Sequence, residues 1–262
     1  MYFRNLKQVF RFSESKLGSS LIKKEEILYG SDPKMKGYLA YDSSLEQKAP
    51  GIIVVHEWWG HDNYCRRRAV QLAEMGYVAL ALDMYGDGKT ACHPKEAKEY
   101  MMETLKNYDI AAGRFLKALE TLKKQPQTDE TRIGAIGYCY GGGIVLNMAA
   151  SGADLKGVVS FHGTLVTHVK PQKGACKAKI LVCNGESDPL ITAEQIKNFK
   201  ELYTAAGIDY KFINYPGAKH AFTNPEATEK GKKFGMPLEY NEAADKQSWA
   251  ELTTFFKDVF PK

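Results

Sequence analysis

Apolar residues along this chain follow two alternating patterns. Continuous apolar runs rich in β-branched residues, with turn residues at their ends, are typical of strands buried on both faces of a sheet. Such runs lie at 51–55, 77–84, 131–138, 155–163, 178–188 and 208–217, after two shorter β-like runs at 25–30 and 36–43. Segments with a helical repeat lie between or after them, at 65–75, 94–125 (one helix or two), 142–151, 192–207 and about 240–258.

This alternation of strands and helices predicts one α/β domain over residues 25–262, because no linker or repeat divides it. The sheet is expected to be mostly parallel, with helices on both faces. Ligands of such sheets bind beyond the carboxyl ends of the strands. Three segments with reactive or aromatic residues are expected there: HEWWG (56–60), GYCYG (137–141) and ESDPL (186–190).

The net charge of +5 comes from the first 24 residues, which carry six Lys or Arg and one Glu. We interpret residues 1–24 as a basic N-terminal extension, although a transit peptide stays open as an alternative. The remaining 30 basic and 30 acidic residues balance. A balanced body argues against a nucleic-acid partner, which would require a basic face.

The five cysteines are odd in number and show no CxxC or CxxH spacing. This pattern favours neither a zinc site nor a disulfide framework and fits a reducing compartment. No segment has the length of a membrane span, and the N-terminus lacks the apolar core of a secretory signal. We therefore expect a cytoplasmic protein that needs no metal or cofactor and has no membrane partner.

The segment IGYCYGG places Cys139 between Gly137 and Gly141, after a buried strand and before a helix. A G-x-nucleophile-x-G turn of this kind lifts the central side chain clear of the sheet. The helix N-terminus favours the thiolate over the thiol. The backbone N–H of Tyr140 is then available to an oxyanion. An inert buried cysteine is the alternative for the motif taken alone.

A nucleophilic thiol needs a base and a group that orients the base. Asp188 follows a predicted strand, and His220 lies in the loop after the last one. The order nucleophile, acid, histidine is that of α/β-hydrolases. The alternatives are a turn or helix-capping role for Asp188 and an exposed loop position for His220.

The segments HEWWG, DMYGDGK, IGYCYGG, ESDPL and YPGAKHAFTNPEA together resemble the dienelactone hydrolase family, from about residue 25 to the C-terminus. The resemblance implies the α/β-hydrolase fold and a triad of Cys139, His220 and Asp188. It also implies that Glu57 contacts the resting thiol. The oxyanion hole would be formed by the backbone N–H groups of Trp58 and Tyr140.

Several aromatic and histidine side chains lie near these motifs in the sequence. With Trp58, an apolar substrate cleft would be lined by Trp59, Tyr85 and Phe222. Ordinary core packing is the alternative for each of these residues. We expect His56 to form structural hydrogen bonds, His93 to be exposed, and His162 either to approach the site or to cap a strand.

The chain departs from the family at two positions. Members that cleave dienelactone hold the substrate carboxylate with two arginines, where this chain has Asp87 and Asn224 nearby. Lys89 or Lys219 would offer only point charges in their place. The departure puts dienelactone in question as a substrate. It also questions any activation in which Glu57 moves to such an arginine.

The sequence therefore predicts a hydrolase that cleaves a small ester or lactone through an acyl-thioester. Ester and lactone substrates cannot be separated at this level. A thiol redox sensor, a non-catalytic binding protein with this fold and a papain-type protease are the alternatives. A monomer or weak homodimer is expected, with a lid from residues 86–95 or 224–239.

The basic extension is expected to be peripheral to the chemistry. Deleting residues 1–20 should leave hydrolytic activity unchanged, because every candidate site residue lies beyond residue 55. A steady-state assay of the truncated and full-length proteins tests this expectation. A large loss of kcat/KM on truncation would contradict it.

Overall fold

A computed structural model describes residues 21–31 and 33–261 of the protein. Most of the predicted basic extension, residues 1–20, lies outside the described residues. The first strand begins at Ile22, so Lys23 and Lys24, which the sequence analysis assigned to the extension, form part of the sheet. No helix within the described ranges is both long and apolar enough to cross a membrane.

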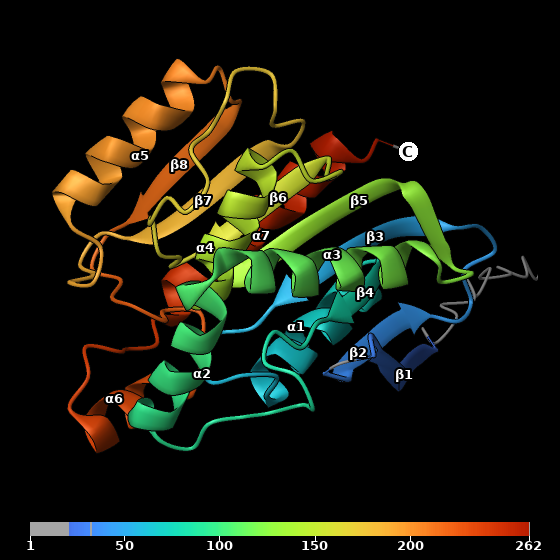
Figure 1. Ribbon diagram of the computed structural model, residues 1–262, viewed down its shortest axis with the longest axis horizontal. Coiled ribbons are helices and arrows are strands. Elements are labelled where there is room, and N and C mark those ends of the chain that lie inside the picture. Colours follow the sequence, from blue (N-terminus) through green and yellow to red (C-terminus); the bar gives the residue numbers. More distant parts are fainter. Residues whose placement is uncertain (1–20, 32, 262) are drawn as a thin grey trace, which may run out of the picture.

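The eight described strands form one sheet in the order β1-β2-β4-β3-β5-β6-β7-β8 (Figure 1). The pairs β1/β2 and β2/β4 are antiparallel and the other pairs are parallel. The sheet is therefore mostly parallel, as predicted. The strands are β1 (Ile22–Tyr29), β2 (Met35–Asp42), β3 (Ala49–Val55), β4 (Val78–Ala81), β5 (Thr128–Tyr138), β6 (Gly157–Phe161), β7 (Lys179–Gly185) and β8 (Tyr210–Tyr215).

Seven helices accompany the sheet in the described part of the chain. They are α1 (Asn63–Glu74), α2 (Pro94–Lys106), α3 (Tyr108–Lys123), α4 (Tyr140–Ala150), α5 (Ala193–Ala205), α6 (Ala227–Phe234) and α7 (Glu242–Val259). The predicted helical region 94–125 is two helices, because Asn107 ends α2 and its side chain caps α3. Helix α6 was not predicted: the sequence analysis named residues 224–239 only as a lid segment and assigned no helix to them.

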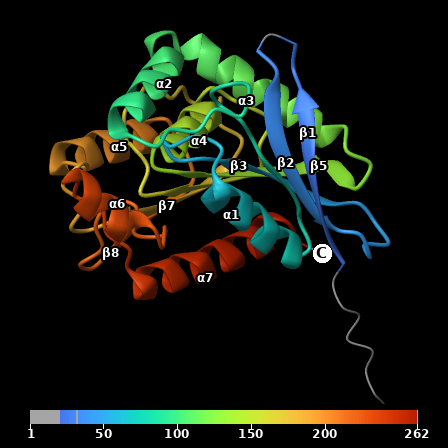
Figure 2. The ribbon, with the colours of Figure 1, turned by 90° about the horizontal axis from the view of Figure 1, so that it is seen from below.

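Helices cover both faces of the sheet (Figure 2). Side chains from α3, α4 and α5 build the core on one face, and side chains from α1 and α7 build the core on the other. Strand β3 shows why its sequence is continuously apolar. Ile53 and Val55 point into the first core, whereas Ile52 and Val54 point into the second. A strand covered on both sides has no polar face.

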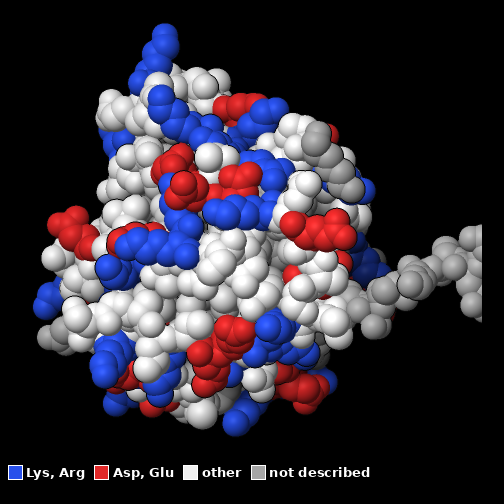
Figure 3. All heavy atoms as spheres, turned by 90° about the vertical axis from the view of Figure 1, so that its right-hand side faces the viewer, with Lys and Arg blue, Asp and Glu red and all other residues white. Residues whose placement is uncertain are grey.

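Charged residues are distributed over the surface without a single-sign field on the face shown in Figure 3, where Lys and Arg alternate with Asp and Glu. Many are paired at short range, including Lys211 with Glu251 at 2.8 Å and Lys156 with Asp154 at 3.4 Å. Exposed pairs of this kind contribute little to stability, so the fold depends mainly on the two apolar cores.

The turn from β5 into α4 is tightly packed against the end of β3. A Cβ atom on Gly137 would lie 2.1 Å from the carbonyl oxygen of Gly141. A Cβ atom on Gly141 would lie 2.5 Å from the carbonyl oxygen of Val55. Both clashes involve backbone atoms that cannot move without displacing a strand or helix. The spacing of the two glycines is thus a packing requirement of the turn.

We expect Gly137→Ala to lower the free energy of unfolding by about 1–3 kcal/mol, the usual cost of overpacking a rigid site. Gly113→Ala is the matched control, since Gly113 is exposed in the middle of α3 and an added Cβ meets nothing within 4 Å. The control should raise the free energy of unfolding by about 0.8–1 kcal/mol, because alanine has the higher helix propensity. Denaturant unfolding of the two variants and the wild type measures both changes. Equal effects of the two substitutions would contradict the packing argument.

Candidate active site

Cys139 is the single residue between the end of β5 and the start of α4. Its backbone has φ 53° and ψ −114°, a conformation that residues with a side chain rarely adopt. Hydrogen bonds hold it there: its N–H donates to the Phe161 carbonyl at 3.1 Å, and its carbonyl accepts from Gly143 and Thr164. A non-glycine residue fixed in a strained conformation is a mark of functional sites. The turn leaves the thiol partly exposed.

Three side chains that are distant in the sequence meet at this turn. Cys139 Sγ lies 3.0 Å from His220 Nε2, and His220 Nδ1 lies 2.7 Å from Asp188 Oδ2. Asp188 follows β7, and His220 lies in the loop between β8 and α6. Parallel strands bring their carboxyl ends to one edge of the sheet, which is why the three residues converge. The proximity expected from the sequence is therefore observed.

The contacts of His220 define its proton positions. An ionised carboxylate only accepts hydrogen bonds, so Nδ1 donates to Asp188 and Nε2 faces the sulfur. Burial by itself would lower the pKa of His220. The negative charges of Cys139 and Asp188 outweigh burial and raise the pKa well above its ordinary value. The pKa of His220 is therefore governed by its two partners rather than by its burial.

Two backbone N–H groups, those of Trp58 and Tyr140, are the expected donors to an oxyanion. Tyr140 is the first residue of α4, and the N–H groups of the first helical turn have no partner within the helix. Trp58 lies three residues after the end of β3. Its carbonyl accepts a hydrogen bond from the Tyr85 hydroxyl at 2.9 Å. An oxyanion-binding role for the two N–H groups stays a prediction.

Glu57 is bonded to Asn224. Its Oε2 accepts a hydrogen bond from Asn224 Nδ2 at 2.7 Å, and no hydrogen bond within the described part of the chain joins it to Cys139, so its expected contact with the thiol stays a prediction. Burial and the nearby Asp62 raise the pKa of Glu57 to about 7, although Asn224, Lys230 and His220 act in the opposite direction. Among residues 21–31 and 33–261, no cation lies within ion-pair distance of this carboxyl group.

Known proteins resemble this chain in sequence and in fold. The model of the dienelactone hydrolase family matches residues 35–260. The chain belongs to the dienelactone hydrolase family. Its sequence is 27% identical over 230 residues to "Protein usf" of Aquifex pyrophilus, covering 86% of this chain and 94% of that protein. It is 26% identical over 230 residues to "Putative carboxymethylenebutenolidase" of Aquifex aeolicus, covering 86% and 93%.

Solved structures show the same likeness. The crystal structure of a dienelactone hydrolase-like promiscuous phosphotriesterase from metagenomic libraries matches with a TM-score of 0.86 at 28% identity, covering 91% of this chain and 99% of that one. A structure named m3DLH matches with a TM-score of 0.86 at 33% identity and the same coverage. The expected α/β-hydrolase fold is confirmed.

This member of the dienelactone hydrolase family has no cation at the two positions where dienelactone-cleaving members have arginines. Asp87 is exposed, and Asn224 is occupied by Glu57. The two nearby lysines are also turned to other partners. Lys219 pairs with Glu239 at 2.6 Å, and Lys89 Nζ lies 5.8 Å from the ring of Tyr100.

The aromatic residues expected to line a cleft differ in their surroundings. Trp58 is half-buried, and its ring contacts Trp59, which stacks on Phe234 of α6 with 6.0 Å between centroids. Tyr85 is buried beneath Trp58. Phe222 is fully buried in the core shared with α1 and α7, so its assignment to a substrate cleft was wrong. The residue lies beside His220 in sequence, but its side chain points into the core.

Trp59 also borders a cavity of about 950 Å³ between α1, α6 and residues 88–92. The two segments predicted as lids contact this region. Ala91 N donates to the Trp59 carbonyl at 2.8 Å, and Lys230 of α6 lies over the Trp59 ring at 5.2 Å. A lid function for either segment stays a prediction.

The histidines outside the triad have structural partners. His56 Nδ1 lies 2.5 Å from the Glu57 carbonyl, and its Nε2 accepts from Met84 N at 3.2 Å. His93 is exposed and caps α2. His162 is fully buried and lies beside His220, with 5.4 Å between ring centroids. No group of three or more His, Cys, Asp or Glu suited to a metal occurs in residues 21–31 and 33–261.

The sequence analysis missed the partners of these residues. Asn224 was noted only as a lost arginine, and neither Thr223 nor Arg68 was considered. Thr223 and Asn224 follow closely on His220, which was the one available signal. Arg68 lies on α1, where three consecutive arginines at 66–68 gave no indication of which one is buried.

The raised pKa of Glu57 predicts a pH-dependent stability. A carboxyl whose folded pKa of about 7 exceeds its usual 4.5 stabilises the fold below pH 4.5 and loses that contribution as the pH rises through 7. Relative to Glu57→Gln, the wild type should lose roughly 3 kcal/mol between pH 4.5 and pH 8. Urea unfolding of both proteins across this range measures it.

Glu229→Gln is the matched control, because Glu229 is exposed and should show no such difference. Parallel stability curves for wild type and Glu57→Gln would contradict the raised pKa.

Proposed function

We propose that the protein hydrolyses a carboxylic ester or lactone with Cys139 as nucleophile, His220 as general acid and base, and Asp188 as the residue that orients His220. The observation that supports this proposal most directly is the continuous contact from Sγ through the imidazole to the carboxylate, at 3.0 and 2.7 Å. Membership of a hydrolase family supports the same reaction class.

In the first half-reaction the Cys139 thiolate attacks the acyl carbonyl carbon and forms a C–S bond. The carbonyl oxygen becomes an oxyanion, which accepts hydrogen bonds from the N–H groups of Trp58 and Tyr140. Each such donor contributes about 3–4 kcal/mol in comparable sites. The intermediate then expels the alcohol oxygen, which takes its proton from the His220 imidazolium, and an acyl-thioester is left.

In the second half-reaction His220, now neutral at Nε2, takes a proton from water as the water oxygen attacks the thioester carbon. Collapse of this second oxyanion breaks the C–S bond, releases the carboxylic acid and returns the thiolate. Asp188 keeps the Nδ1 proton in place throughout, so that Nε2 always faces the reacting atoms. These two half-reactions require no cofactor or metal.

We infer that the substrate is a small neutral ester or lactone rather than dienelactone. A substrate carboxylate would need a bidentate cation, and lysine does not reproduce arginine in that role. Asp87 and Asn224 offer no cation, and Asn224 already binds Glu57. The expectations of a cytoplasmic monomer or weak homodimer, with no nucleic-acid or membrane partner, belong to the same proposal.

Phosphotriesters are a second candidate substrate class. The specific observation is the likeness to a promiscuous phosphotriesterase over 91% of this chain. A neutral phosphotriester presents an electrophilic centre and a polarised oxygen, as an ester does. The same thiolate and N–H groups would act on both. A redox sensor or a non-catalytic binding protein would not need the hydrogen bond between His220 and Asp188.

The first experiment follows p-nitrophenyl acetate hydrolysis from the first turnover in wild type, Cys139→Ala and Cys139→Ser. We expect the alanine variant to lose at least about 10³-fold in kcat/KM, because the nucleophile is gone. Accumulation of an acyl-enzyme on Cys139, detected by intact-protein mass spectrometry, should accompany the initial burst.

Cys176→Ala is the control, since this half-buried thiol donates only to the Ala178 carbonyl. Its activity should equal that of the wild type. Undiminished hydrolysis by a folded Cys139→Ala protein would refute the mechanism. A panel of neutral esters, lactones, dienelactone and a p-nitrophenyl phosphotriester then separates the substrate classes.

A further inference from the structure

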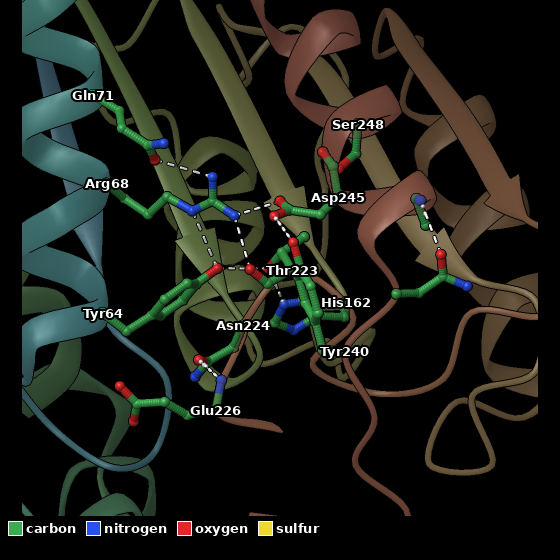
Figure 4. Close-up of polar contacts among 12 residues, drawn as sticks. Tyr64, Arg68, Gln71, His162, Thr223, Asn224, Glu226, Tyr240, Asp245 and Ser248 are labelled. Carbon is green, nitrogen blue, oxygen red and sulfur yellow. Dashed lines mark hydrogen bonds and ion pairs between the residues drawn. The ribbon is translucent and has the colours of Figure 1, made fainter. Parts of the chain in front are cut away.

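A buried chain of polar side chains runs from Arg68 through Tyr64 and Thr223 to His162 (Figure 4). It begins at Arg68 on α1, which is 5% exposed and pairs with Asp245 of α7. Arg68 Nε donates to the Tyr64 hydroxyl at 3.4 Å, and the Tyr64 hydroxyl lies 2.6 Å from Thr223 Oγ1. Thr223 Oγ1 in turn lies 2.7 Å from His162 Nε2.

The direction of these hydrogen bonds follows from the first donor. Arginine carries no acceptor, so the Tyr64 oxygen accepts from Arg68. Within the described residues the Tyr64 hydrogen then has one acceptor, Thr223 Oγ1, and the Thr223 hydrogen has one acceptor, His162 Nε2. This order pairs both hydroxyl hydrogens, whereas the reverse order leaves the Tyr64 hydrogen unpaired. It makes Nε2 of His162 an acceptor and puts the proton of the neutral ring on Nδ1, a buried atom with no hydrogen-bond partner among the described residues.

His162 is held tightly in this place. It follows β6, its backbone has φ 40°, and its N–H donates to the Cys183 carbonyl at 2.8 Å. Its ring is fully buried and meets the ring of His220 edge to face, at an interplanar angle of 66°. Phe222 closes the other side at 5.4 Å between centroids. Residues fixed in strained conformations beside reactive groups are often functional.

We propose that His162 is a positioning residue for His220. The chain that begins at Arg68 keeps the His162 ring in one orientation. That ring packs against His220 and keeps it aligned between Cys139 and Asp188. The effect on turnover rests on the proposed hydrolase function, whereas the effect on the thiol does not.

The charge state of His162 agrees with this geometric role. Burial lowers its pKa well below the ordinary value, and the charges of His220 and Arg68 act in the same direction. A neutral His162 ring places no second positive charge against His220.

Other ionisable groups also surround the two rings. Cys139 and Tyr138 face them from the β5 turn, Glu57 from the end of β3, Asp188 from the β7 loop, Tyr64 and Arg68 from α1, and Asp245 from α7. A pH profile must therefore be compared between variants that leave all of these groups in place.

The test compares Thr223→Val, which removes the hydroxyl at constant shape, with Thr223→Ser, which retains it. Thr128→Val is the control, because Thr128 is also fully buried but its hydroxyl has no partner. Three measurements are made on the full chain: the tautomer of His162 by imidazole ¹⁵N NMR, the pH dependence of iodoacetamide alkylation at Cys139 by peptide mass spectrometry, and kcat and KM for p-nitrophenyl acetate.

We expect Nδ1-protonated His162 in the wild type. Thr223→Val should lower kcat by about tenfold to a hundredfold, as a slight misplacement of a catalytic group does, and leave KM nearly unchanged. It should also raise the pH at which Cys139 reaches half-maximal reactivity, since a less aligned imidazolium stabilises the thiolate less. Thr223→Ser should restore both properties, and Thr128→Val should match the wild type.

Wild-type kinetics and alkylation in Thr223→Val would overturn the proposal, as would a wild-type His162 protonated on Nε2. Should Thr223→Val not fold, Thr223→Ala removes the same hydroxyl, leaves every ionisable group in place and is judged by the same criteria. If the wild type does not hydrolyse esters, the proposed function fails, but the tautomer and the alkylation profile still decide the role of His162.

Discussion

The close packing of the β5–α4 turn is the constraint on which the rest of the site depends. Gly137 and Gly141 let the turn approach its own backbone and the end of β3 more closely than any side chain allows. This approach forces Cys139 into a left-handed conformation and directs its sulfur out of the sheet. It also places the N-terminus of α4 at the sulfur. One packing requirement thereby fixes the thiol and the nearby backbone donors together.

The parallel sheet supplies the remaining parts of the site at the same edge. Asp188 and His220 come from loops that follow β7 and β8, and Glu57 follows β3. These loops differ in length and sequence, yet the strands beneath them are rigid because both of their faces are buried. The site therefore combines a fixed arrangement of side chains with connecting loops of unlike length and sequence.

Electrostatics divides the buried ionisable groups into two sets. His220 is surrounded by anions and favours the charged form, whereas His56 and His162 are kept neutral mainly by burial. Glu57 belongs to neither set, since burial raises its pKa and the hydrogen bond from Asn224 lowers it. A dienelactone hydrolase relative without the arginine clamp thus keeps a buried carboxyl group at the site but gives it a neutral partner.

The sequence by itself determined the α/β class, most strands and helices, and the candidate positions Cys139, Asp188 and His220, because buried strands, their ends and the glycine-flanked turn leave local patterns. It did not reveal α6, a helix of eight residues whose buried positions are the small residues Ala227 and Gly231. It also assigned Phe222 to the cleft, since adjacency to His220 says nothing about side-chain direction. The partners of Glu57 and His162 were decided only by tertiary structure. Hydrogen bonds such as that from Asn224 to Glu57 join positions 167 residues apart, and no local pattern encodes such a pairing.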